Sequence, residues 1–390
     1  MGGPRGAGAA AAAAVCAALA LTACTTSPAA PTAPPSSSSP SSPAASSPSA
    51  TASTPAPPAS ASASPAPARP RYAAGATVLA RRLVVPWGVA FLPSGSALVA
   101  ERKSGEVVLV SPTGRVTSVG RVPGVADQGE GGLLGLAVDP DDATRVYAYL
   151  TSTQDDNRVV ALRLSGGTLR FERALLTGIP AGRRHNGGRI VVGPDGDLWI
   201  GTGDAGDTAR AQRKGDLGGK ILRIARDGSV PSDNPFGTPV WSYGHRNVQG
   251  LAFDSAGRLW ATEFGQDTYD ELNLIRKGGD YGWPLVEGRG GDSRYVDPQV
   301  VWRTDDASPS GLAIVGDVAF VGALKGRRLW QVPLMGGRAG TPVAAFTGDY
   351  GRLRTVAAAP DGTLWVTTSN RDGRGNPTAD DDRILRVTLR

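Results

Sequence analysis

Cysteine and histidine are scarce in this 390-residue sequence, which contains two of each. Long hydrophobic runs are also missing: the run AAAAAVCAALALTAC after Arg5 is too short for a bilayer-spanning helix and is typical of an export signal. Cys16 would leave with that signal, so the mature chain could form no intramolecular disulfide. The net charge of +6 is modest. No basic run with interleaved aromatic residues suggests a nucleic-acid groove, so we expect a solvated basic surface.

The end of the export signal, LTAC at residues 21–24, resembles a bacterial lipobox. Cleavage before Cys24 would leave a diacylated N-terminal residue that anchors the chain in a membrane. The alternative is an ordinary signal peptide, whose small residues merely permit cleavage. We therefore predict a lipoprotein signal peptide at residues 1–23 and a protein outside the cytoplasm, anchored to the cell membrane.

The segment after the signal consists almost entirely of Ser, Pro, Ala and Thr, up to about Arg71. Few of these side chains could offset the entropy of ordering the backbone. The composition predicts a lipid-anchored disordered linker at residues 24–71, and its proline content favours an extended tether. A single folded domain is then expected at residues 72–390, because all-β propellers and barrels often reach this length as one unit.

Helix signals are scarce after Tyr72, where Gly, Pro and Asp-Gly turns separate short runs rich in Val, Leu, Trp and Thr. Six segments share one plan: a small residue, an apolar strand, a turn built on Pro-Asp-Gly or Ser-Gly, and a second strand with a small polar end. They are WGVAFLPSGSALVAER, LGLAVDPDDATRVYAYLT, GGRIVVGPDGDLWIGTGD, QGLAFDSAGRLWATEFG, SGLAIVGDVAFVGALKG and RTVAAAPDGTLWVTTSN.

Six copies at a spacing of roughly 45 to 60 residues predict an all-β fold. The expected architecture is a six-bladed β-propeller, whose four-stranded blades surround a channel. The last strand, RILRVTL, is expected to close the ring by pairing near residues 76–83. A β-sandwich is the rival fold, but it gives no reason for six similar hairpins.

One histidine lies at a loop tip of the third copy. His185 precedes the first strand of that copy and Asp204 follows its second strand, so both should lie at neighbouring ends of one hairpin. His245 precedes the fourth copy in the same way. Because such loops converge on the channel of a propeller, polar residues distant in sequence are expected to meet there.

Four segments in these positions carry a family resemblance: GEGGLLGLAVDP, HNGGRIVVGPDGDLWIGTGD, GHRNVQGLAFDSAGRLWATEFG and DELNLIRKGGDYGWP. With them the chain resembles the soluble quinoprotein glucose dehydrogenase and aldose sugar dehydrogenase family, over nearly all of the chain after Tyr72. Members of that family are six-bladed propellers that carry pyrroloquinoline quinone (PQQ) and calcium.

The resemblance implies the catalytic residues. His185 falls on the histidine of the H-x-x-G-R motif and would be the general base, with Asp204 as the carboxylate that orients it. Arg246 would stabilise the negative charge that develops on the quinone when it accepts hydride. Glu130 falls where the glucose enzyme has glutamine, and a carboxylate there could hydrogen-bond the substrate. The alternative for His185 is a turn histidine satisfied by backbone groups.

The same resemblance places a cofactor contact at Asn247, beside Arg246. It also places cations that would meet the three carboxylates of the quinone at Lys325, Arg352 and Arg354. The alternative for Arg352 and Arg354, which are two residues apart on a strand, is an exposed basic stripe.

Calcium sites are implied in the segment ATEFGQDTYDELNLI. The carbonyls of Gly265 and Gln266 would bind the calcium that holds the cofactor. Asp270, Glu271 and the carbonyl of Tyr281 would bind a second, structural calcium. The alternative for the acidic pair is a turn that faces solvent.

The expected function is oxidation of the anomeric hydroxyl of aldoses to lactones, with electrons passed to an external acceptor. The aromatic residues that the glucose enzyme places over its sugar are not evident in this sequence. The resemblance therefore does not imply that glucose is the substrate. Two alternatives stand beside it: a propeller without cofactor that acts as a binding or scaffolding module, and a lactone hydrolase in which calcium activates water. The quinone-binding cations argue against both.

Overall fold

The computed structural model describes Gly2 and residues 70–390. The export signal, Cys24 and nearly all of the expected linker therefore lie outside the described residues. Among residues 70–390 the helical content is one 3-10 turn, η1 (Thr208–Gln212), and no helix there is long and apolar enough to cross a membrane. The rest of this region is strands and loops, as the scarcity of helix signals predicts.

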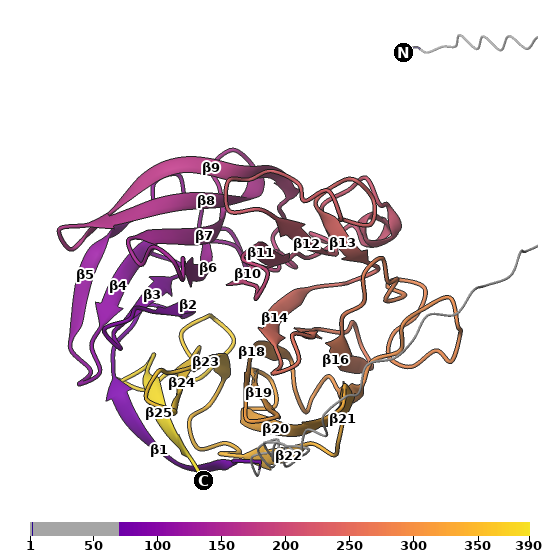
Figure 1. The fold of residues 1–390 in the computed structure, drawn as a ribbon. Helices are drawn as coiled ribbons and strands as arrows, with labels where there is room; N and C mark the ends of the chain where they lie inside the picture. Colours follow the sequence, from indigo (N-terminus) through magenta and orange to yellow (C-terminus); the bar gives the residue numbers. More distant parts are fainter. Residues whose placement is uncertain (1, 3–69) are drawn as a thin grey trace, which may run out of the picture. The chain divides into compact units, whose positions relative to one another are not determined.

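Residues 70–390 form six antiparallel sheets, arranged as the blades of a propeller around one axis (Figure 1). Blade 1 contains β2 (Pro86–Phe91), β3 (Ala97–Glu101), β4 (Glu106–Val110) and β5 (Val116–Arg121). Blade 2 contains β6 (Leu133–Val138), β7 (Arg145–Thr151), β8 (Asp156–Ser165) and β9 (Thr168–Pro180). Blade 3 contains β10 (Arg189–Val192), β11 (Leu198–Gly201), β12 (Lys220–Ile224) and β13 (Val240–Tyr243).

The remaining blades follow the same order. Blade 4 contains β14 (Val248–Phe253), β15 (Leu259–Glu263), β16 (Tyr269–Leu274) and β17 (Val300–Arg303). Blade 5 contains β18 (Pro309–Val315), β19 (Val318–Ala323), β20 (Arg328–Met335), β21 (Arg338–Ala339) and β22 (Val343–Ala345). Blade 6 contains β23 (Leu353–Ala358), β24 (Leu364–Thr368), β25 (Ile384–Leu389) and β1 (Ala73–Ala80). The prediction of a six-bladed propeller is confirmed.

The six repeated segments of the sequence are the two innermost strands of the six blades, and β2, β6, β10, β14, β18 and β23 surround the axis (Figure 1). The turn of the third copy shows why its sequence is required. Gly196 has a φ of +83°, which the Gly of Pro-Asp-Gly adopts without a Cβ penalty. Its N–H donates to Gly193 O at 2.9 Å, which closes the hairpin between β10 and β11.

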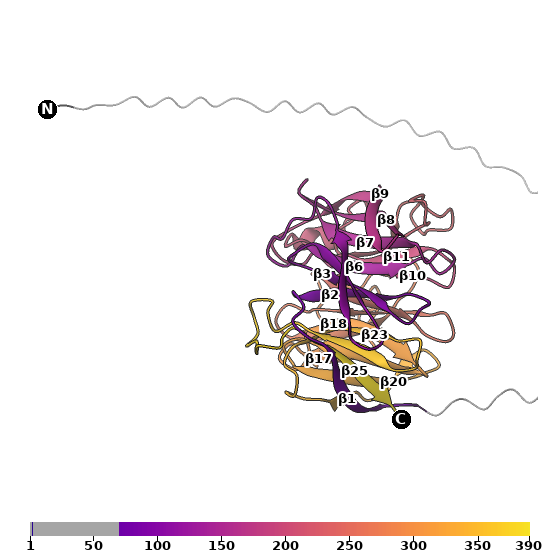
Figure 2. The ribbon, with the colours of Figure 1, turned by 90° about the vertical axis from the view of Figure 1, so that its left-hand side faces the viewer.

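The ring closes between the two ends of the described chain. β1 pairs antiparallel with β25, so the first strand of residues 70–390 becomes the outermost strand of the last blade. The backbones of Tyr72 and Arg390 exchange hydrogen bonds of 2.7 and 2.9 Å, and the two strands lie side by side in both views (Figures 1 and 2). The predicted closure by RILRVTL is confirmed.

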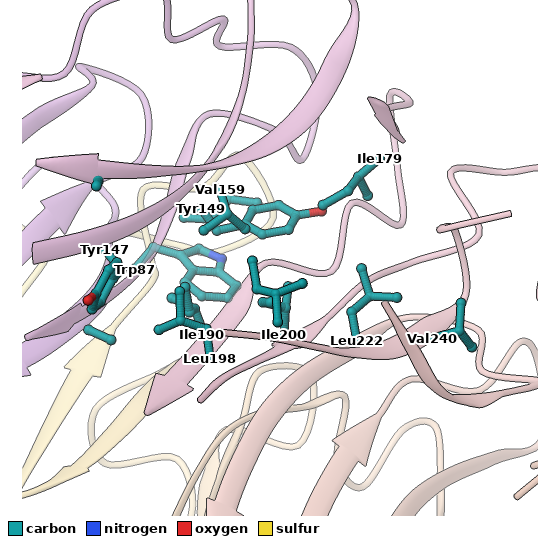
Figure 3. Packing of buried hydrophobic residues seen from close by; sticks show 14 residues of the cluster. Trp87, Tyr147, Tyr149, Val159, Ile179, Ile190, Leu198, Ile200, Leu222 and Val240 are labelled. Carbon is teal, nitrogen blue, oxygen red and sulfur yellow. The ribbon is translucent and has the colours of Figure 1, made fainter. Parts of the chain in front are cut away.

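Apolar side chains fill the spaces between blades. One cluster runs between blades 2 and 3 and includes Trp87, Tyr149, Ile190 and Ile200, each no more than 1% exposed (Figure 3). Burying a side chain of this size contributes about 1.5–3 kcal/mol. Tyr149 also donates its hydroxyl to Asn186 O at 2.8 Å. The core therefore holds the loop that contains His185.

Candidate active site

His185 and Asp204 meet at the end of the β10–β11 hairpin. His185 Nδ1 lies 2.7 Å from Asp204 Oδ1, and the carboxylate is fully buried whereas His185 is 8% exposed. Asp204 Oδ1 also accepts the N–H of Gly206 at 2.8 Å. Burial alone would raise the pKa of Asp204, but hydrogen bonds from His185, Gly206 and Trp283 bring that pKa below its ordinary value. Asp204 is thus ionised and fixes the orientation of the imidazole.

The backbone around this pair is tightly fitted. His185 has a φ of +58°, a left-handed conformation that non-glycine residues seldom adopt. Glu130 Oε2 accepts its backbone N–H at 2.9 Å, and Asn186 Oδ1 accepts the N–H of Gly182 at 3.0 Å. A Cβ at Gly203 would lie 1.9 Å from His185 O, so only glycine fits there. These contacts hold the turn in its left-handed form.

Glu130 connects His185 to the far side of the ring. Its Oε1 lies 2.8 Å from Arg374 Nη1, in the loop between β24 and β25, and part of that loop reaches toward the centre of the ring (Figure 1). Burial would raise the pKa of Glu130, but the N–H of His185 and the charge of Arg374 outweigh burial and lower it. Glu130 is therefore a carboxylate that faces the central cavity.

Arg246 lies between blades 3 and 4 and is 9% exposed. Its Nη2 donates to Gln266 Oε1 at 2.9 Å, and its backbone N–H donates to Glu263 Oε2 at 2.9 Å. The other oxygen of Glu263 lies 2.9 Å from Nδ1 of His245, which is fully buried. His245 therefore supports the strand end that carries Arg246 from a fully buried position.

Asn247 follows Arg246 and joins blades 3 and 4. Its Oδ1 accepts the N–H of Gly187 at 3.0 Å. Its buried Nδ2 has no hydrogen-bond partner among residues 70–390. An unsatisfied buried donor is costly, and such atoms in native structures generally have a role. This donor is therefore available to an acceptor from a ligand.

A cavity of about 220 Å³ lies at the centre of this face of the ring. Its walls include Trp87, Arg102, Glu130, Arg354 and Asp372. His185 and Arg246 do not line it directly, but their hydrogen-bond partners Glu130 and Phe264 do.

The cavity is surrounded by buried positive charge. Arg102 and Arg354 are 4% exposed, and Arg189 lies 4.3 Å from the ring of Trp87 beneath the cavity. Burial lowers the pKa of Arg354 to about 10 and that of Arg189 to about 9. Neither Arg102 nor Arg189 forms an ion pair with any residue of 70–390, whereas Asp372 pairs with Arg354 at 3.3 Å. The cavity therefore favours a ligand that carries negative charge.

A second cavity of about 460 Å³ adjoins the first and shares Leu324 and Arg374 with it. Lys325 and Arg352 line this outer cavity. The side chain of Lys325 is 57% exposed and forms an ion pair with Asp305, whereas that of Arg352 is 11% exposed and lies 3.1 Å from Asp372. With Arg354 also buried, the two arginines do not form an exposed stripe.

The loop between β15 and β16 contains the residues expected to bind calcium. Glu287 Oε1 accepts four successive N–H groups there, from Gln266 at 2.6 Å to Tyr269 at 3.1 Å. The carbonyls of Gly265 and Gln266 accept no hydrogen bond from any residue of 70–390. Two free carbonyls on a glycine-bearing loop fit a hard cation such as calcium.

The second expected calcium site fits less well. Asp270 accepts the N–H groups of Gly265 at 2.9 Å and Ser308 at 2.6 Å, so both of its oxygens are engaged. Burial and the neighbouring Glu263 raise the pKa of Glu271 to about 8. Tyr281 stacks on His245. Within the part of the chain that the structure describes, no three His, Cys, Asp or Glu side chains are grouped to hold a metal.

Sequence reasoning missed several residues of this site. Trp283 donates Nε1–H to Asp204 Oδ2 at 2.9 Å, and Asp372 pairs with two arginines. One signal was present for Asp372, because it follows the second strand of its repeat much as Asp204 does in the third copy. Gln249 also lines the central cavity, where its Oε1 accepts Nη1 of Arg354 at 3.2 Å. Arg102 and Gln249 carried no comparable signal.

Comparisons with known proteins agree with this architecture. A protein-family model described as glucose/sorbosone dehydrogenase matches residues 83–385. Aldose sugar dehydrogenase YliI of Escherichia coli is 30% identical over 344 residues, which cover 77% of this chain and 93% of that protein. Quinoprotein glucose dehydrogenase B of Acinetobacter calcoaceticus is 35% identical over 258 residues, 56% of this chain and 54% of that protein. The PQQ-bound aldose sugar dehydrogenase of Streptomyces coelicolor superposes with a TM-score of 0.79 at 49% identity, covering 83% of this chain and 100% of that one.

Asp372→Asn should destabilise the fold. The side chains of Asp372 and Arg354 are 3% and 5% exposed, and removing one partner of a buried pair costs about 3–5 kcal/mol. Arg354 and Arg352 hold the pKa of Asp372 below its ordinary value of 3.8, although burial opposes them. Its stabilisation is therefore complete above that value and is lost as pH falls through the lower folded-state pKa.

Denaturant unfolding of parent and variant measures this difference, which should be largest near neutral pH and shrink in acid. The control is Asp361→Asn, because Asp361 is 50% exposed and lies 3.9 Å from Arg386. Such a surface pair contributes about 0–1 kcal/mol. Equal losses in the two variants would contradict the assignment of Asp372 as the counter-charge of the cavity.

Proposed function

Because the chain belongs to the glucose/sorbosone dehydrogenase family, we propose that it oxidises aldose sugars at the anomeric hydroxyl to lactones, with bound PQQ and calcium. The single observation that carries the proposal is the excess of buried guanidinium groups at the central cavity, which Arg102 and Arg354 line and beneath which Arg189 lies against Trp87. Among residues 70–390, neither Arg102 nor Arg189 has a carboxylate partner, whereas Arg354 pairs with Asp372. A tricarboxylate such as PQQ supplies the missing negative charge.

The residues present fit the cofactor in two respects. Its carboxylates would be held by Arg354 in the central cavity and by Arg352 and Lys325 in the outer cavity that adjoins it. The Nδ2 of Asn247, which has no hydrogen-bond partner among residues 70–390, can donate a hydrogen bond beside Arg246. PQQ, when bound, accepts the hydrogen of the anomeric carbon as hydride.

His185 is the proposed general base. Its Nδ1 is engaged by Asp204 at 2.7 Å, so the proton of the neutral ring lies on Nδ1 and the lone pair on Nε2 is free. Nε2 can then take the proton of the anomeric hydroxyl as hydride leaves the same carbon. The buried carboxylate of Asp204 stabilises the charged imidazole that results. Arg246 would stabilise negative charge as it develops on the acceptor, and Glu130 would hydrogen-bond the sugar.

Calcium would be held first by the carbonyls of Gly265 and Gln266, which accept no hydrogen bond within the described part of the chain. Its contribution would be to polarise the cofactor. A second calcium at Asp270, Glu271 and the carbonyl of Tyr281 would offset the repulsion between the buried Glu271 and Glu263. An external acceptor would then collect the electrons.

Replacing Arg352 tests the cofactor site. Arg352→Gln removes one cation but leaves Arg354 to pair with Asp372, so the fold should persist. A lost charge-assisted hydrogen bond costs about 1.5–3 kcal/mol, so PQQ affinity should fall roughly 10- to 100-fold. Titration of the apo-protein with PQQ in saturating calcium, followed by the absorbance of the bound quinone, measures this.

The control is Arg163→Gln, which removes a charge on the outer strands of blade 2, where Arg163 pairs with Asp142 and Glu172. It should leave PQQ affinity unchanged. No quinone binding by the parent would refute the dehydrogenase proposal itself.

His185→Gln separates catalysis from cofactor binding. Glutamine keeps a polar side chain of similar reach but cannot accept a proton, so turnover should fall by a factor of about 10² to 10⁴. PQQ and calcium affinities should stay close to those of the parent. The comparison is the rate of aldose oxidation at saturating PQQ and calcium. A larger loss in His245→Gln, whose side chain is fully buried, would mean that the base is the other histidine.

The membrane anchor is proposed from the LTAC segment at residues 21–24, which lies outside the described residues. Diacylated Cys24 would hold the domain outside the cytoplasm on the cell membrane. Cys24→Ala should move the protein from the membrane fraction to the soluble fraction of the exporting host, as seen by fractionation and immunoblotting. A variant that is processed and sediments as the parent does would rule out lipidation.

A further inference from the structure

Trp283 joins two parts of the site that come from different blades. It lies in the loop between β16 and β17 of blade 4 and is 9% exposed. Its backbone N–H donates to Gly244 O at 2.9 Å, and its carbonyl accepts Nε2 of Gln212, at the end of η1 in blade 3, at 2.9 Å. Hydrogen bonds to both backbone groups of Trp283 thus fix the position from which its indole projects.

The indole N–H is the donor to the outer oxygen of Asp204. His185 and Gly206 both engage Oδ1, and Trp283 Nε1 is the partner of Oδ2 at 2.9 Å. A carboxylate held at both oxygens cannot rotate about its Cβ–Cγ bond. Because the N–H stabilises the carboxylate more than the carboxylic acid, it also favours the ionised form of Asp204.

The face of the same indole supports the cation of the site. Arg246 Cζ lies 5.4 Å from the centroid of the Trp283 ring, within the range of a cation–π interaction. Arg246 is otherwise held through Gln266 Oε1 at 2.9 Å and through Phe264 O at 3.3 Å. The ring therefore limits where the guanidinium can move.

We propose that Trp283 is a positioning residue for sugar oxidation: its N–H orients Asp204 behind His185, and its ring face orients Arg246. The inference rests on the proposed function, because Trp283 would align His185, the proposed base, with Arg246, the proposed cation of the reaction. The two duties reside in different parts of one side chain and can be removed separately. Trp283→Phe loses the N–H and keeps an aromatic face, whereas Trp283→Leu loses both.

Other charged groups also face the His185–Asp204 pair and keep their contacts in Trp283→Phe. Glu130 accepts the backbone N–H of His185, and Arg374 pairs with Glu130 from the loop between β24 and β25. The charge of Arg246 is felt by Asp204 across the interface between blades 3 and 4. Any shift in titration on removing the indole N–H is therefore measured against a constant background.

The first test uses the full chain without cofactor. The chain has only two histidines, so imidazole labelling gives two sets of NMR resonances, and His245→Gln assigns them. In Trp283→Phe the midpoint at which the His185–Asp204 pair takes up a proton should move to higher pH, by roughly 0.5 to 1 unit, because one donor to the carboxylate is gone. The matched control is Trp260→Phe, which removes a buried indole bond of the same length, 2.9 Å to Asp254 Oδ2, outside the site.

The second test separates the two duties in the chain loaded with PQQ and calcium. Trp283→Phe should lower kcat about 10-fold or more and leave PQQ affinity within about 2-fold of the parent, because Arg246 keeps its aromatic support. Trp283→Leu should lower kcat and weaken PQQ binding roughly 5- to 10-fold. Trp260→Phe should change neither quantity.

Several outcomes would overturn the inference. An unchanged titration midpoint in Trp283→Phe, or an equal shift in Trp260→Phe, would show that the N–H does not act on Asp204. Equal loss of PQQ affinity in Trp283→Phe and Trp283→Leu would show that the ring face does not support Arg246.

If the variants fold poorly, the indole N–H resonance of Trp283 in the parent protein gives the test. That resonance should titrate with the same midpoint as His185, and a pH-independent resonance would refute the contact. Absence of PQQ binding by the parent would count against the proposed function alone, since the titration needs no cofactor.

Discussion

The pairing of β1 with β25 is the constraint on which the rest of the structure depends. It joins the two ends of a domain of about 320 residues, closes the sixth blade and so fixes the angle of every other blade around the axis. Glu130 precedes β6, His185 precedes β10, Arg246 precedes β14 and Asp372 follows β24. These residues come from four blades, and their distances are determined only in a closed ring. An open stack of blades would keep each hairpin and lose the site.

The hydrophobic core and the polar site are continuous. Tyr149 in blade 2 reaches Asn186 O, and Asn186 lies next to the left-handed residue His185. Steric strain at one residue costs of order 1–3 kcal/mol and persists only where the surroundings impose it. Here the surroundings are a buried aromatic residue, the carboxylate of Glu130 and a glycine that admits His185 O at close range. The conformation of His185 is therefore a consequence of packing between blades.

Electrostatics and stability are linked at the axis. Buried guanidinium groups without partners are unfavourable in a folded protein, and Arg102 and Arg189 have no carboxylate partner among residues 70–390. Burial of the apolar clusters between the blades contributes stabilising free energy, which offsets the cost of burying these charges. An anionic ligand would relieve the repulsion and stabilise the domain by mass action. Unfavourable buried charge inside a fold that is otherwise well packed is typical of a functional site.

The sequence by itself determined the all-β class, the six repeats, the closing strand and the meeting of His185 with Asp204, because each follows from local turn chemistry and from the two-residue alternation of strands. It also indicated the family, through motifs that lie within single hairpins. The tertiary structure alone decided that Trp283 contacts Asp204 across 79 positions, that Asp372 neutralises Arg352 and Arg354, and that Lys325 is the more exposed cation. The physical reason is that these contacts depend on distant parts of the chain: Trp283 meets Asp204 between blades 4 and 3, and Asp372 reaches the two arginines of its own blade through the loop that follows β24. Such partners are set by the closed ring and by the paths of its loops, which no local pattern of residues encodes.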